Sequence, residues 1–117
     1  MPQFLSRLVV QRRRDPVALT KAIVDHVVAH LAEALEQGRF KPLGMATGRT
    51  MEPLYAALIR RLAAWPDARL EQLKHCWLSF NLDEYVGLPT GDSHSFAAYM
   101  HAHLGRHLDL SPCQLRL

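Results

Sequence analysis

The chain has 117 residues, of which 49% are hydrophobic and 21% are charged, and its formal net charge is +3. This length predicts one domain, residues 1–117, and the composition excludes disordered and collagen-like proteins. No apolar run approaches the roughly 18 residues that span a bilayer, which excludes a transmembrane protein. Two cysteines are too few for a disulfide scaffold, and the N-terminal residues do not have the form of a secretory signal, so we expect a cytoplasmic protein.

The small excess of positive charge lies largely in Arg12–Arg14. Nucleic-acid binders usually carry a wider basic face with interleaved aromatic residues, so this run predicts a solvated turn before a helix. We therefore expect no nucleic-acid partner and no membrane partner. A mild positive potential also suits anionic small molecules such as sugar phosphates.

The first elements have clear sequence signals. Phe4–Gln11 is β-branched near its end and predicts a strand. Asp15 precedes a proline, which is typical of an N-cap followed by the first helical position. Apolar residues spaced by three and four predict a helix over Pro16–Gln37, with Gly38 as its C-cap.

The middle of the chain continues the alternation of strands and helices. Phe40–Ala46 predicts a buried strand that runs into a tight loop. Apolar spacing from about Met51 predicts a second helix that ends at Pro66. The polar stretch Asp67–Lys74 predicts a connector with one or two helical turns. Cys76–Leu82 is apolar and aromatic and predicts a third strand, in which Cys76 is a buried structural thiol.

The last third of the chain begins with the loop Val86–Asp92, which contains glycine and proline. Ser93 is the expected cap of a third helix, whose apolar side carries Phe96 and Met100. Leu108–Leu117 predicts a turn and the start of another strand.

The alternating order predicts an α/β fold, a Rossmann-like parallel sheet with flanking helices. Ligands of such sheets bind outside the carboxyl ends of the strands. Two polar loops, 47–50 and 83–85, follow predicted strands at that position. We therefore expect a ligand site between them.

The first loop contains Thr47, Gly48, Arg49 and Thr50, and a helix follows it. Free backbone N–H groups at a helix N-terminus, two hydroxyl groups and a cation suit a phosphate. The glycine spacing fits neither a Walker A loop nor a dinucleotide fingerprint. An ordinary tight turn that needs glycine for backbone reasons is the alternative.

The second loop begins with two adjacent carboxylates, Asp83 and Glu84. Side chains alternate in an extended chain, so the two carboxylates cannot point the same way. A partly desolvated carboxylate at a strand end can have a raised pKa and move protons. A solvated loop start or an N-cap is the alternative.

Two histidine pairs, His26/His30 and His103/His107, have the i, i+4 spacing that can hold a metal on one helix face. Neither pair is followed by a third ligand at fixed spacing, so we expect no metal and no cofactor. His94 and His101 flank the ligand end of the third helix.

Two segments resemble one known family. Leu43–Leu58, LGMATGRTMEPLYAAL, is similar to the phosphate loop and following helix of glucosamine-6-phosphate deaminases. Phe80–Leu104, FNLDEYVGLPTGDSHSFAAYMHAHL, is the sharper match, since FNLDEYVGLP is an uncommon string. The wider superfamily includes 6-phosphogluconolactonases, which resemble a W-x-D-E-R pattern at this point, so the deaminase/isomerase branch is favoured.

The resemblance implies roles for the two loops. Loop 47–50 would hold the 6-phosphate of the sugar. Asp83 would be the general base that moves a proton between C2 and C1 of the open-chain sugar, and Glu84 would be the second carboxylate of this catalytic pair. Glu84 and Tyr85 would shape the site. Loss of the amine would leave a ketose phosphate and ammonia.

The sequence departs from the family pattern at Arg49, where Ser or Gly is usual, and at Met51, where Pro is usual. Family members are about twice as long as this chain, beyond the usual length of one domain. We therefore expect a truncated deaminase, its N-terminal half, whose open sheet favours a homo-oligomer. A lactonase and a non-catalytic sugar-phosphate-binding module are the alternatives.

Overall fold

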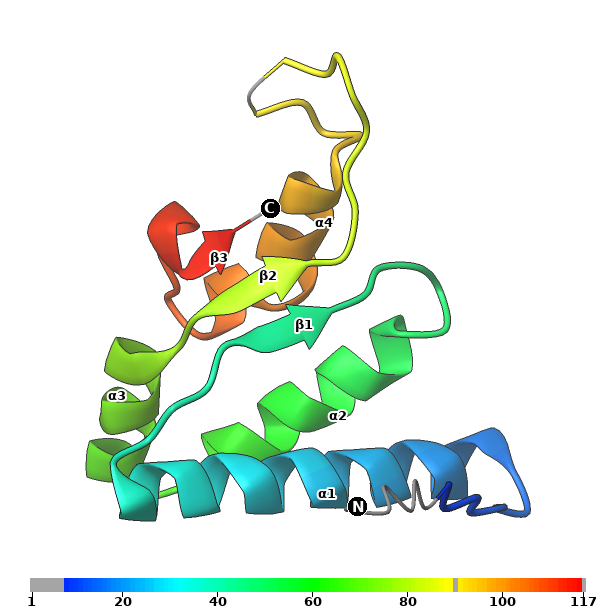
Figure 1. The fold of residues 1–117 in the computed structure, drawn as a ribbon, viewed down its shortest axis with the longest axis vertical. Coiled ribbons are helices and arrows are strands. Elements are labelled where there is room, and N and C mark those ends of the chain that lie inside the picture. Colours follow the sequence, from blue (N-terminus) through cyan, green and yellow to red (C-terminus); the bar gives the residue numbers. More distant parts are fainter. Residues whose placement is uncertain (1–7, 90, 117) are drawn as a thin grey trace, which may run out of the picture.

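Three short parallel strands form one sheet in a computed structural model that describes residues 8–89 and 91–116 (Figure 1). The strands are β1 (Leu43–Met45), β2 (Ser79–Asn81) and β3 (Leu115–Arg116), in the order β1-β2-β3. Leu43 pairs with Ser79, and Ser79 pairs with Leu115. The predicted α/β class with a parallel sheet and flanking helices is therefore confirmed.

Helix α1 (Pro16–Gln37) has the predicted bounds and both predicted caps. The Asp15 carboxylate accepts a hydrogen bond from the Ala18 N–H at 2.7 Å. Gly38 ends the helix in the left-handed region, with φ 65°. The apolar stripe of this helix faces the core, where Leu31 is 1% exposed.

Helix α2 (Glu52–Ala63) ends before Pro66, as predicted, but α3 (Asp67–Cys76) is longer than the predicted one or two turns. Acidic Asp67 in its first turn and basic residues in its last turn complement the helix dipole, and Leu73 anchors the helix in the core.

This longer helix corrects the prediction for Cys76. The residue ends α3 instead of opening a strand, and its thiol is exposed, so it is not the buried thiol that we expected. The buried place at this point of the chain belongs to Trp77, which is 2% exposed and donates from its indole N–H to the Ser79 hydroxyl at 3.0 Å. The larger apolar side chain takes the core position because it buries more surface.

Helix α4 (Phe96–His103) is capped by Ser95, whose hydroxyl oxygen accepts from the Ala98 N–H at 3.0 Å. Ser93 is therefore not the cap, because it lies too far from the first helical turn to reach its free amides. Two short 3-10 helices, η1 (Gly105–His107) and η2 (Pro112–Gln114), then lead into β3. The strand expected near the C-terminal end is confirmed.

The strand predicted over Phe4–Gln11 is wrong for the part of it that the structure describes. Residues 8–11 form no strand, and residues 4–7 lie outside the described part. Leu8 and Val10 are 88% and 74% exposed. Residues 8–11 pair with no strand among the described residues, so β-branched side chains alone do not make a strand here.

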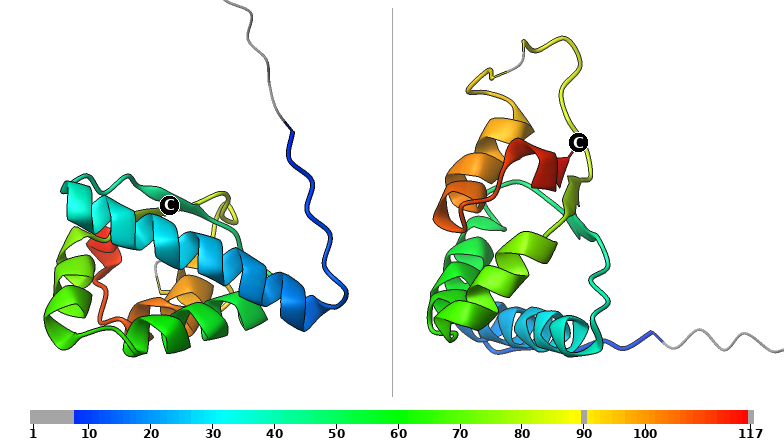
Figure 2. Two further views of the ribbon diagram at one scale, coloured as in Figure 1. Left: turned by 90° about the horizontal axis from the view of Figure 1, so that it is seen from below. Right: turned by 90° about the vertical axis from the view of Figure 1, so that its left-hand side faces the viewer.

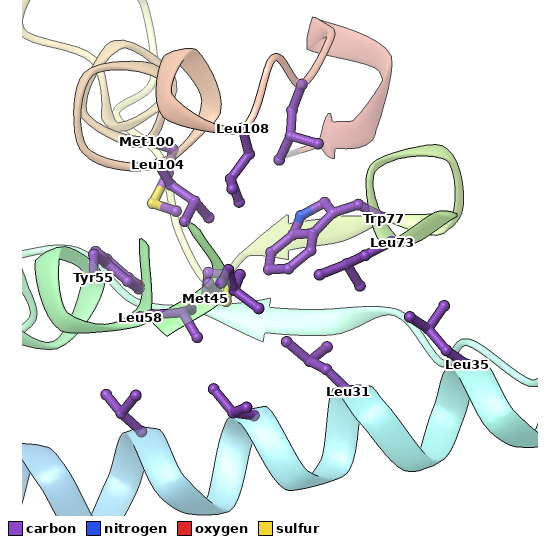
Figure 3. Packing of buried hydrophobic residues seen from close by; sticks show 14 residues of the cluster. Leu31, Leu35, Met45, Tyr55, Leu58, Leu73, Trp77, Met100, Leu104 and Leu108 are labelled. Atoms are coloured by element: carbon purple, nitrogen blue, oxygen red, sulfur yellow. The ribbon is translucent and has the colours of Figure 1, made fainter. Parts of the chain in front are cut away.

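The helices pack with one face of the sheet. Met45 and Ser79 on this face are buried, and Figure 3 shows Trp77 pointing into the apolar cluster that also holds Met45 and Leu104. In the right-hand view of Figure 2, α4 lies to one side of the strands. The opposite face carries Gly44, Phe80 and Arg116, all exposed. Among the described residues, no helix is long and apolar enough to cross a membrane.

Candidate functional site

The two polar loops leave the sheet side by side. Met45 pairs with Asn81 in parallel register, and the Leu82 N–H then donates to the Met45 carbonyl at 3.1 Å. The chain after β1 and the chain after β2 therefore start from the same edge of the sheet (Figure 1). This edge holds the carboxyl ends of the strands, where ligands of open α/β sheets bind.

The loop after β1 is a tight turn into α2. The Met51 N–H donates to the Gly48 carbonyl at 3.1 Å, and the Glu52 N–H donates to the Arg49 carbonyl at 3.3 Å. Gly48 has φ 109°, a conformation that L side chains rarely adopt. This backbone conformation therefore fits both alternatives for the loop, since a phosphate-binding turn and an ordinary tight turn both need glycine here.

The loop presents groups that suit an anion. No acceptor for the backbone N–H groups of Gly48, Arg49 and Thr50 is found within the described part of the chain. These amides precede the N-terminus of α2, where the helix dipole favours negative charge. Arg49 and Thr50 are exposed, and Thr47 is half-buried.

Two tyrosine hydroxyl groups hold the carbonyl groups of this loop. Tyr55 of α2 donates to the Ala46 carbonyl, and Tyr99 of α4 donates to the Gly48 carbonyl at 2.7 Å. Burial raises the pKa of Tyr55 to about 12, and burial together with the nearby Glu52 carboxylate raises the pKa of Tyr99. Both hydroxyl groups therefore keep their protons at neutral pH and act as donors.

The two adjacent carboxylates have different surroundings, as predicted for neighbours in an extended chain. The Glu84 carboxylate accepts from the Phe96, Ala97 and Tyr85 N–H groups at 2.8, 2.9 and 3.0 Å. The hydrogen bond from Phe96, followed by those from Ala97 and Tyr85, holds the pKa of Glu84 below its usual 4.5. Asp83 is exposed, and its carboxylate has no hydrogen-bond partner among the described residues.

Residues 85–89 lead away from the sheet after Glu84, and residues 91–95 lead back to α4 (Figure 1). Tyr85 is 58% exposed, and its ring packs against the ring of Phe96 with a centroid distance of 4.8 Å. Tyr85 thus lies where the acidic loop (residues 83–85) meets the start of α4.

In the part of the chain that the structure describes, no group of three or more potential metal ligands lies together. His103 faces the Glu52 carboxylate at 3.6 Å, and its ring lies 4.3 Å from that of Tyr99. His94 contacts Asp92 at 3.2 Å on the surface.

Sequence reasoning identified both loops but missed the two tyrosines that hold the first one. Tyr55 and Tyr99 fall at apolar helical positions, where a core role is the simplest expectation. The carbonyl partner of Tyr99 lies 51 residues away in the sequence. No spacing rule indicates that contact.

Comparison with known proteins gives a consistent result, although no family model matches. The chain is 32% identical over 111 residues to a glucosamine-6-phosphate deaminase of Caenorhabditis elegans and 30% identical over 113 residues to one of Porphyromonas gingivalis. Each match covers 95% of this chain. The chain spans 39% and 40% of the lengths of these relatives. A third relative, from Lysinibacillus sphaericus, is 48% identical over 61 residues, which cover 52% of this chain and 24% of the relative.

A solved structure supports the same relationship. It is described as a monomeric glucosamine-6-phosphate deaminase of the NagB superfamily, and it matches this chain with a TM-score of 0.62 at 27% identity. The match covers 88% of this chain and 39% of that protein. Sequence and fold thus agree over most of the chain.

Proposed function

The chain belongs to the glucosamine-6-phosphate deaminase family, and on that premise we propose that it binds an amino-sugar 6-phosphate between its two polar loops. The observation that carries this proposal is the side-by-side exit of the two loops from β1 and β2. One loop offers free amides to an anion, and the other offers an exposed carboxylate.

The 6-phosphate is assigned to the loop formed by Thr47, Gly48, Arg49 and Thr50. Its amides supply hydrogen bonds and the α2 dipole supplies a favourable potential. The Arg49 guanidinium adds a charged donor that can bind two phosphate oxygens at once. Its position on an exposed turn leaves the side chain free to approach the ligand.

Proton transfer is assigned to Asp83. Its carboxylate takes the C2 proton of the open-chain aldose while the carbonyl oxygen O1 gains a proton from solvent, which gives an enolamine. The Asp83 carboxyl then returns its proton to C1, and the amine nitrogen loses one proton to solvent, which leaves an imine at C2. Water then adds to the imine, and ammonia leaves to give the ketose phosphate. Glu84 is assigned a positioning role, because its carboxylate is already occupied by backbone N–H groups of α4 and its own loop. Tyr85 shapes the site at the start of α4.

Glucosamine-6-phosphate is the first substrate to test. The chain is mixed with the sugar phosphate, binding is followed by NMR titration, and ammonia release is measured in the same samples. Binding with ammonia release supports a deaminase. Binding without ammonia release favours the second candidate, a non-catalytic sugar-phosphate-binding module. Hydrolysis of a 6-phosphogluconolactone would instead indicate the lactonase branch. Absence of binding overturns the proposal.

The expected homo-oligomer would use the open face of the sheet. Phe80 is 38% exposed and Leu82 is 70% exposed on this face, where a Cβ added at Gly44 would lie 3.4 Å from the Leu82 side chain. Parallel sheets are usually covered on both faces, so a second copy of the chain is the proposed cover. The cytoplasmic location and the absence of nucleic-acid and membrane partners stay predictions.

A further inference from the structure

We infer that Tyr99 is a positioning residue. Through it, α4 sets the position of the phosphate loop (residues 47–50) relative to the acidic loop (residues 83–85). This inference rests on the proposed function and assigns a role to a residue outside both loops. Its basis is a pair of contacts on one helix. Glu84 binds the start of α4, and Tyr99 joins its middle to the Gly48 carbonyl.

The first contact orients a peptide plane. The Gly48 carbonyl accepts from the Tyr99 hydroxyl at 2.7 Å and from the Met51 N–H at 3.1 Å. The described residues contain no cis peptide bond. In a trans peptide the carbonyl of one residue and the N–H of the next point in opposite directions. Holding the Gly48 carbonyl toward α4 therefore turns the Arg49 N–H away from the protein, toward the place assigned to the phosphate.

The neighbouring peptide is held in the same way. The Tyr55 hydroxyl donates to the Ala46 carbonyl, which directs the Thr47 N–H away from α2. Tyr55 is buried and belongs to the core, whereas Tyr99 is half-buried at the rim. Of these two tyrosines, Tyr99 is therefore the one whose hydroxyl group can be removed with less effect on folding.

The second contact ties the same helix to the acidic loop. The Glu84 carboxylate bridges the Phe96 and Ala97 N–H groups, which lie within one helical turn of Tyr99. The helix between these contacts is a rigid unit, and Tyr99 is further fixed by its ring contact with His103 at 4.3 Å. The affinity of a sugar phosphate that touches both loops would depend on the distance between the two loops. The affinity of inorganic phosphate would depend only on the orientation of the amides in the phosphate loop.

The test uses Tyr99→Phe in the full chain, a change that keeps the ring and removes the hydroxyl group. Dissociation constants for inorganic phosphate and for glucosamine-6-phosphate are measured by NMR titration. One lost hydrogen bond predicts weaker binding of inorganic phosphate by about 2- to 10-fold, with at least as large a loss for the sugar phosphate. Ser79→Ala is the matched control, because it removes one side-chain hydrogen bond, that from Trp77, at the amino end of β2. We expect the control to keep the wild-type affinities.

A second readout needs no ligand. The amide resonances of Gly48, Arg49 and Thr50 should shift in Tyr99→Phe and stay unchanged in Ser79→Ala. Unchanged loop resonances together with unchanged affinities would overturn the role of Tyr99. If the wild-type chain binds neither ligand, the proposed function fails. In that case the resonances still test Tyr99 by themselves: shifted loop resonances in Tyr99→Phe would show that the hydroxyl group orients the loop, and unchanged ones would overturn that role.

Discussion

The Glu84 carboxylate accepts a hydrogen bond from the Phe96 N–H at 2.8 Å and so joins the acidic loop to the first turn of α4. An ionised carboxylate at a helix N-terminus satisfies amides that have no partner within the helix, and it interacts favourably with the helix dipole. The neighbouring Asp83 carboxylate is left at the surface by this arrangement. Of the two adjacent carboxylates, one is thus held by backbone N–H groups and the other is exposed.

This contact predicts an acid-sensitive component of stability. Hydrogen bonds from the backbone lower the folded-state pKa of Glu84 below 4.5, so the unfolded chain binds this proton first as the pH falls. The contribution of Glu84 is therefore complete above about pH 4.5 and is lost as the pH falls toward the folded-state pKa. We expect Glu84→Gln to flatten the pH dependence of the free energy of unfolding below that point, as measured by denaturant titrations at several pH values.

The control for this experiment is Glu71→Gln. Its side chain is 60% exposed and contacts Lys74 at 3.3 Å on the surface of α3. Exposed ion pairs contribute little to stability, so this variant should follow the wild-type pH profile. A Glu84→Gln profile parallel to that of the wild type would show that the carboxylate does not stabilise α4.

Gly48→Ala should disturb the phosphate loop through its backbone. The φ of 109° is strained for alanine although no atom lies within 4 Å of the added Cβ, so we expect a loss of about 1–3 kcal/mol in stability. Relaxation of that strain turns the loop amides and weakens phosphate binding. Gly38→Ala is the matched variant, since it also has positive φ and open space but lies at the far end of α1. Calorimetry with inorganic phosphate should separate them, and equal phosphate affinities for both variants would contradict the role of the loop.

Elements with strong local signals were predictable from sequence. Helix α1 has its N-cap, its proline and its C-cap glycine within the segment itself, and its bounds match the prediction. The strand predicted over 4–11 had only β-branched composition, and its described part, residues 8–11, pairs with no strand in the described structure. Strand formation depends on neighbours that a single segment does not contain.

In the candidate site, too, features with a local sequence signal were predictable and features that depend on tertiary contacts were not. The two loops were recognisable because each follows a strand and has a distinctive composition. The hydrogen bonds between Glu84 and α4 could not be recognised from the sequence, because the partners Phe96 and Ala97 lie 12 and 13 residues away. Helix α3 was also underestimated, since its polar sequence hides a single buried anchor, Leu73. Contacts of this kind arise from tertiary packing and leave no periodic pattern.

Self-association through the open sheet face predicts a concentration-dependent mass. Light scattering after gel filtration should find a species of twice 13.3 kDa that dissociates on dilution. Phe80→Thr places a β-branched residue that suits a strand in β2 and removes the aromatic ring, so it should shift the equilibrium toward the monomer. Val17→Thr, at an 80% exposed position of α1, should leave the mass unchanged. A monomer at every concentration, as the name of the matched structure describes for that protein, would contradict this prediction.

Asp83→Asn separates proton transfer from binding. The amide keeps the size of the side chain but cannot accept the C2 proton, so the rate of ammonia release should fall by at least about 100-fold. Phosphate affinity should be unchanged, because no hydrogen bond joins Asp83 to the loop of Thr47–Thr50 among the described residues. Exchange of the C2 proton with deuterated solvent, followed by NMR, isolates the same step when no ammonia is formed. Asp109→Asn is the control, since this carboxylate is 86% exposed and asparagine tolerates its φ of 52°. Undiminished proton exchange in Asp83→Asn would remove Asp83 from the mechanism.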